Sequence, residues 1–136
     1  MCIRDSYVTG IEASRLSMVL AVLARRGGHN LTRKEVYAAT VGGMKIVEPA
    51  ADLATTLALA STATETPLPH GLVVVGELGL GGEVRSVPQL TQRLNEAERL
   101  GFHTAIVPAG SGKHSSSMKI IEVRNLYQAL EAAMKS

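Results

Sequence analysis

Apolar residues recur along this chain at two spacings, one typical of amphipathic helices and one typical of strands. Helices are expected over Ala13–Arg26, Ala50–Ser61, Gln89–Leu100 and Leu126–Met134. Strands are expected over residues 35–41, 72–75, 83–87, 104–107 and 118–123. The uninterrupted run Leu-Val-Val-Val at 72–75 is typical of a fully buried strand. This mixture of strands and helices favours an α/β fold, specifically an α+β two-layer sandwich.

The ends of these helices carry recognisable start and stop residues. Pro49 precedes the second helix and suits its first turn. In the third helix, the side chains expected to face the core are Leu90, Leu94, Ala97 and Leu100. Gly101 is expected to end that helix, and Asn125 to cap the last one.

Composition narrows the possible functions. The chain has 136 residues, of which 46% are hydrophobic, with no Trp and one cysteine, Cys2. It therefore forms neither an internal disulfide nor a cysteine-based zinc site, and it offers few aromatic rings for stacking on bases. No apolar run approaches the roughly 18 residues of a membrane span, so we expect no membrane association and a cytoplasmic location. Residues 1–6 join poorly to the rest of the chain, and we interpret them as a non-native leader before one domain, residues 7–136 of a longer protein.

The stretch "VPAGSGKHSSS", residues 107–117, contains the Gly-Lys pair of a phosphate-binding loop. The full motif requires glycine five residues before Gly112, where this chain has Val107. It also requires Ser or Thr after Lys113, where this chain has His114. Ser-rich sequence and the β-branched pair at 120–121 come next in place of a helix. We therefore expect an ordinary surface loop.

Other candidate chemistry is sparse. Glu48 and Asp52 flank the start of the second expected helix, where its dipole favours carboxylates. The four histidines are dispersed through loops and strand starts, so we expect no metal site. They are His29, His70, His103 and His114.

The most specific sequence is "GELGLGGEVRSVPQLTQRLNEAERLGFHTAIVP", residues 76–108. Its order of strand, glycine-rich turn, strand, helix and strand resembles the proteolytic domain of the Lon protease family, which shares its fold with the second domain of ribosomal protein S5. A second landmark, "GGMKIVEPAADLATTLALAS" at 42–61, is similar to the Lon nucleophile turn and the helix after it. The resemblance places Ala50 at the nucleophilic serine and Thr91 at the catalytic lysine. Ala has no hydroxyl and Thr no amine, so we expect no catalysis by this dyad.

A Lon-like domain without its dyad is typical of the RadA (Sms) family of bacterial DNA-repair proteins. "VTGIEASRLSMVLAVLARRGG" and "VGGMKIVEPAADLA" are similar to that family too, so the resemblance covers almost the whole chain. It implies a zinc finger and a DNA-dependent ATPase core ahead of this domain. ATP, Mg²⁺ and Zn²⁺ are then expected only in those missing parts, with no cofactor here. It also implies hexameric rings that promote branch migration in recombinational repair.

Charge is distributed unevenly, which suits an anionic partner on one face. Residues 1–34 hold six Lys or Arg and two acids, whereas residues 35–80 hold one Lys and five acids. The candidate DNA-backbone contacts are Arg25, Arg26, Arg33, Lys34, Lys45, Arg85 and Lys113.

Two alternatives remain open. One is an active Lon-like peptidase that uses another serine, such as Ser61 or Ser86. The other is a stand-alone RNA-binding or structural module of the same fold.

Overall fold

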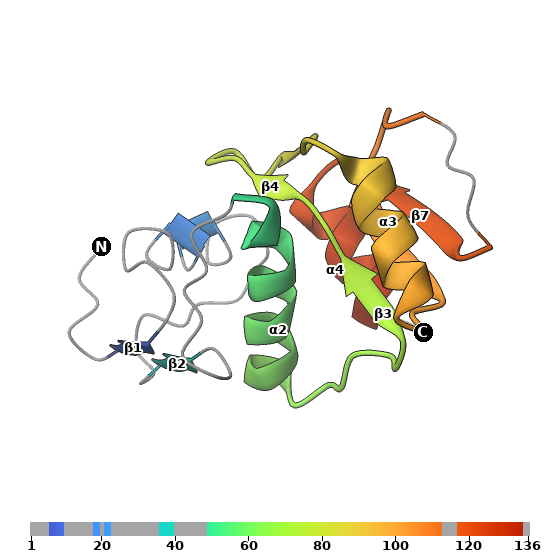
Figure 1. Cartoon of the computed structure of the whole chain (residues 1–136). Helices are drawn as coiled ribbons and strands as arrows, with labels where there is room; N and C mark the ends of the chain where they lie inside the picture. Colours follow the sequence, from blue (N-terminus) through green and yellow to red (C-terminus); the bar gives the residue numbers. More distant parts are fainter. Residues whose placement is uncertain are drawn as a thin grey trace.

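The computed structural model describes residues 6–9, 18–19, 21–22, 36–39, 49–112 and 117–134 (Figure 1). The strands in these ranges are β1 (Ser6–Thr9), β2 (Val36–Ala39), β3 (Leu72–Val74), β4 (Glu77–Leu78), β5 (Val84–Arg85), β6 (Thr104–Pro108) and β7 (Lys119–Val123). A short 3-10 turn, η2 (Pro49–Ala51), leads directly into α2 (Asp52–Thr64). The other helices with described bounds are α3 (Leu90–Arg99) and α4 (Leu126–Met134).

The main sheet has three parallel strands in the order β3-β6-β7. Thr104 of the central strand β6 lies opposite Leu72 on one side and Lys119 on the other. The connection from β3 to β6 contains the antiparallel hairpin β4–β5 and then α3. A second parallel pair joins β1 to β2.

Strand β6 divides the core in two because its side chains alternate between the faces of the sheet. Ile106 packs in a buried cluster with residues of α2 and α4. Ala105 and Val107 pack in the other cluster, with Leu90 and Leu94 of α3. The helices therefore cover the sheet in layers, and the α/β class expected from the sequence is confirmed.

Helix positions agree closely with the expected ones. Helix α4 occupies the predicted residues, and the Gln128 N–H donates to Asn125 Oδ1 at 2.9 Å, so Asn125 is the N-cap as expected. Gly101 follows α3 with a φ of +99°, a conformation that favours glycine. Of the predicted helix at 13–26, residues 18–19 and 21–22 are described, and they are helical.

Two expectations are wrong, and two strands have no counterpart among the expected elements. Helical spacing assigns Leu100 to the core, but it is 62% exposed because α3 ends at Arg99 and the chain turns away there. The run at 72–75 is expected to be fully buried, yet residues 72–74 are half-buried and only Val75 is buried. The sequence pattern indicates neither strand β1, which begins at Ser6, nor the short strand β4 at Glu77–Leu78.

Candidate functional site

Ala50, which the sequence resemblance assigns to the position of the Lon nucleophile, lies in the turn η2 immediately before α2. Its side chain is buried in the cluster that contains Leu90. The Gly76 N–H donates to the Ala50 carbonyl at 3.0 Å, and the Leu53 N–H donates to the Gly76 carbonyl at 3.1 Å. These two bonds fix the turn against the chain that leaves β3, and the methyl group of Ala50 fills a packing position there.

Thr91, which the sequence resemblance assigns to the position of the Lon lysine, lies in the first turn of α3 and is exposed. Its neighbour Leu90 packs in the same cluster as Ala50. The assignment of Ala50 and Thr91 to the two dyad positions stays a prediction from the resemblance. The methyl group of Ala50 cannot act as a nucleophile, and the hydroxyl of Thr91 cannot act as the amine base of a Ser–Lys dyad.

Asp52, the first residue of α2, links that helix to the hairpin. The side chain is 3% exposed, and the Leu78 N–H of β4 donates to its Oδ2 at 3.2 Å. The sequence predicts a carboxylate favoured by the helix dipole, and its place in the first turn agrees with that. The hydrogen bond from Leu78, 26 residues away, also connects the start of α2 to β4, and no local sequence signal predicts this contact.

The hairpin turn is organised by the carboxylate of Glu83. The Gly81 N–H donates to Glu83 Oε1 at 3.0 Å, and a Cβ at Gly79 would lie 2.1 Å from the same oxygen. Backbone hydrogen bonds from Glu83 itself and Gly81, with the guanidinium of Arg85, lower the pKa of Glu83. This folded turn presents Leu80, which is 74% exposed.

Arg85 is the one DNA-contact candidate within the described ranges. Its Nη2 lies 3.4 Å from Glu83 Oε2, and its side chain is 56% exposed. Arg124, which the sequence did not single out for DNA contact, is also exposed and lies on the adjoining backbone, because the Val84 N–H donates to the Arg124 carbonyl at 2.9 Å. Residues 85 and 124 are far apart in sequence, so only the fold reveals this pair of cations.

The remaining DNA-contact candidates lie outside the described residues; they are Arg25, Arg26, Arg33, Lys34, Lys45 and Lys113. Glu48, His29 and His114 also lie outside them. Within the described ranges, no group of three or more His, Cys, Asp or Glu side chains is placed to hold a metal ion.

Within the candidate phosphate-binding loop after β6, residues 109–112 and 117 are described. Residues 109–112 follow the strand without helix, Gly110 and Gly112 have positive φ, and the next element is the strand β7. A phosphate-binding loop opens a helix whose first N–H groups hold the phosphates. Because residues 113–116 lie outside the described residues, the expectation of an ordinary surface loop stays a prediction.

Ser61, one of the two alternative nucleophiles, lies in the last turns of α2, where its hydroxyl donates to the Thr66 carbonyl. Ser86 is exposed immediately after β5.

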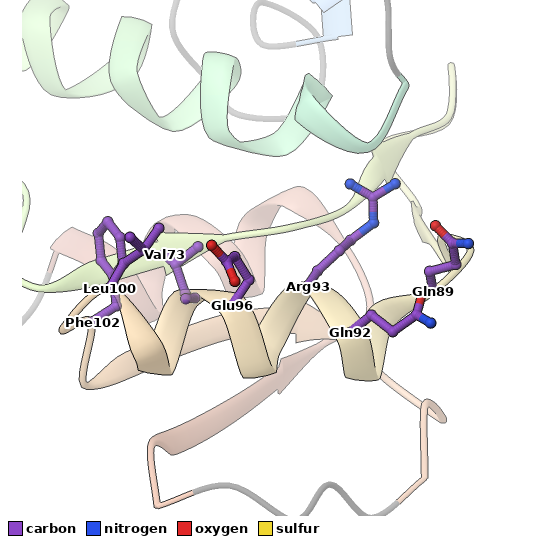
Figure 2. Close-up of a pocket in the computed structure, with 8 residues that line it drawn as sticks. Val73, Gln89, Gln92, Arg93, Glu96, Leu100 and Phe102 are labelled. Atoms are coloured by element: carbon purple, nitrogen blue, oxygen red, sulfur yellow. The ribbon is translucent and has the colours of Figure 1, made fainter.

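A groove of about 620 Å³ runs along α3 beside the strand β3 (Figure 2). At the carboxyl end of α3 it is lined by Val73, Leu100 and Phe102, and Figure 2 shows these three side chains together. The other half is polar, with Gln89, Gln92 and Arg93 near the start of the helix and Glu96 between the two halves. Glu96 is paired with Arg99, which lowers the pKa of Glu96.

None of the described helices is both long and apolar enough to cross a membrane.

Comparison with known proteins places this arrangement in a family. The chain belongs to the family described as subunit ChlI of Mg-chelatase, whose model matches residues 16–111. Relatives named DNA repair protein RadA match more of it. The protein of Escherichia coli (strain K12) is 46% identical over 123 residues, which are 89% of this chain and 27% of that protein. The Synechocystis protein is 41% identical over 127 residues, 93% of this chain and 25% of that protein. In Mycolicibacterium smegmatis the identity is 39% over 124 residues, 91% of this chain and 27% of that protein.

The resemblance to RadA proteins drawn from the sequence is therefore confirmed. The chain spans about a quarter of the length of these relatives.

Proposed function

We propose that this chain is the Lon-like part of a RadA-type DNA repair protein, and that it acts without peptidase chemistry. Its contributions are contacts to the DNA backbone and contacts between copies in a ring. The observation that carries the proposal is identity of 39–46% to proteins named DNA repair protein RadA over about nine-tenths of this chain. The side chains of Ala50 and Thr91 support the non-catalytic part.

In the whole protein, a DNA-dependent ATPase core drives branch migration of recombination intermediates. ATP, Mg²⁺ and Zn²⁺ belong to that part of the protein, and the complete protein works in the cytoplasm as a hexameric ring. The present domain then supplies surface for DNA and for neighbouring copies.

The DNA contact depends on charge. Phosphate is recognised by exposed guanidinium and ammonium groups without regard to base sequence. Arg85 and Arg124 are exposed on adjoining backbone segments, and Glu83 partly offsets Arg85. Removing the Glu83 carboxylate should therefore strengthen phosphate binding, whereas removing Arg85 should weaken it.

The test measures binding of a fluorescent branched DNA by anisotropy over a series of salt concentrations. Each lost phosphate contact lowers the slope of log K against log salt by about 0.9. We expect that reduction for Arg85→Ala, a larger one for the double variant Arg25→Ala/Arg26→Ala, and tighter binding for Glu83→Gln. The matched control is Arg99→Ala, because that guanidinium is held by Glu96. Absent or salt-independent binding would refute the DNA contact.

Two further outcomes would replace the proposal. Turnover of an unstructured protein substrate that Ser61→Ala or Ser86→Ala abolishes would establish a peptidase with a different nucleophile. Tighter binding to structured RNA than to branched DNA would favour an RNA-binding module.

A further inference from the structure

A buried carboxylate ties the start of α2 to the hairpin β4–β5. Asp52 is 3% exposed, and its Oδ2 accepts the Leu78 N–H of β4 at 3.2 Å. A hydrogen bond to a carboxylate in a site shielded from water is strong and directional. It therefore fixes where this part of β4 lies relative to α2, and Figure 1 shows β4 beside the start of that helix.

The hairpin needs such anchors because it is short. Strands β4 and β5 have 2 residues each, and a two-stranded hairpin by itself is at best marginally stable. Its second strand and turn are held from another side. The Val84 N–H donates to the Arg124 carbonyl at 2.9 Å, and the Leu126 N–H donates to the Gly82 carbonyl at 2.8 Å. Asp52 supplies an anchor for the first strand.

The anchored strand lies beside the arginine that we expect to contact DNA. In the hairpin, Leu78 is paired with Val84, and the neighbouring pair is Glu77 with Arg85. If β4 is released from α2, the hairpin can tilt about the backbone bond between Val84 and Arg124. The Arg85 guanidinium then moves relative to that of Arg124.

We propose that Asp52 is a positioning residue for DNA binding, which holds the hairpin so that Arg85 and Arg124 contact the same phosphate backbone. It does not touch DNA, because its carboxylate is buried and phosphate would repel it. The inference rests on the proposed DNA contact of Arg85 and adds a residue on which that contact depends.

Charge and position predict opposite effects when Asp52 is replaced. By electrostatics alone, removing a negative charge should strengthen binding to a polyanion. Releasing the hairpin should instead weaken binding, because a phosphate contact is lost. Asp52→Asn keeps an oxygen that can accept the Leu78 N–H and loses the charge, so it should bind DNA at least as tightly as the unmodified chain. Asp52→Ala loses both, so weaker binding by this variant reports the position of the hairpin.

The test measures binding of a fluorescent branched DNA by anisotropy over a series of salt concentrations, at a temperature where circular dichroism shows each variant to be folded. We expect Asp52→Ala to lower the slope of log K against log salt by about 0.9, the loss of one phosphate contact. Asp52→Ser, whose hydroxyl does not reach as far as Oδ2, should behave in the same way and is used if Asp52→Ala does not fold. The matched control is Ala60→Gly, which destabilises α2 at a fully buried position further along the helix and should leave the slope unchanged.

Coupling to Arg85 separates positioning from general stabilisation. If Asp52 acts through Arg85, the double variant Asp52→Ala/Arg85→Ala should lose no more of the slope than Arg85→Ala alone. A larger loss in the double variant would overturn the inference, as would unchanged or tighter binding by Asp52→Ala. Equal losses for Asp52→Ala and either Asp52→Asn or Ala60→Gly would also overturn it.

These outcomes leave the proposed DNA contact in place, because the unmodified chain still binds in each of them. Absent DNA binding by the unmodified chain would instead refute the proposed function, and this inference with it.

Discussion

The buried bond between Asp52 and the hairpin gives the sharpest stability prediction. Asp52→Ala removes the acceptor of the Leu78 N–H, and both residues are buried, at 3% and 2% exposure. A buried donor left without an acceptor costs about 1–3 kcal/mol. Loss of a carboxylate from the first turn of a helix adds about 0.3–1 kcal/mol. We therefore expect the free energy of unfolding to fall by about 1–4 kcal/mol.

Asp52→Asn separates the two contributions. The amide oxygen can still accept the Leu78 N–H, so only the charge is lost, and we expect a decrease of about 1 kcal/mol or less. Urea unfolding followed by far-ultraviolet circular dichroism measures both variants, with Glu122→Ala on the exposed side of β7 as a control expected within about 0.5 kcal/mol of the unmodified chain. Equal destabilisation by Asn and Ala would show that the hydrogen bond is not the cause, and a negligible effect of Ala would refute the argument altogether.

Two further predictions concern the core and the surface of α3. Ile106→Ala, at a fully buried position at the centre of the sheet, should lower the free energy of unfolding by about 2–5 kcal/mol. In the same assay, Leu100→Ala should change the free energy of unfolding by less than about 0.5 kcal/mol. Comparable losses for both variants would contradict the exposed position of Leu100. The Arg99 guanidinium stabilises the charged form of Glu96 and holds the pKa of Glu96 below 4.5. The ion pair therefore stabilises the fold above pH 4.5, and this contribution is lost as the pH falls through the lowered pKa of Glu96. A carboxyl-carbon NMR titration should show the Glu96 midpoint below 4.5 and its return towards 4.5 in Arg99→Gln; an unmoved midpoint would exclude Arg99 as the cause.

The exposed tip and the proposed DNA contact occupy different parts of one hairpin. Leu80 lies at the tip, while Arg85 lies on β5 beside the backbone of Arg124. The Glu83 carboxylate links the two, because it closes the turn and also pairs with Arg85. Glu83→Gln keeps an amide oxygen that can accept the Gly81 N–H and removes the charge beside Arg85, so it should strengthen DNA binding without opening the turn.

Several elements were predictable because their signals are local. Helix α4 begins after a capping Asn125, and α3 ends before Gly101, whose positive φ is easily adopted by glycine. The spacing of Leu90 and Leu94 placed the buried side of α3 correctly. The overall similarity that indicated RadA proteins is confirmed by the relatives, while the dyad positions assigned to Ala50 and Thr91 stay a prediction.

The sequence by itself thus determined the α/β class, most helix boundaries, the failed phosphate-loop motif and the relationship to RadA proteins, because each depends on residues close together in the chain or on overall similarity. Tertiary structure alone decided the burial of β3, the exposure of Leu100 and the bond from Leu78 to Asp52. It also decided that Arg85 lies beside the backbone of Arg124. These features depend on which distant segments pack together, and helical or strand periodicity carries no information about that choice.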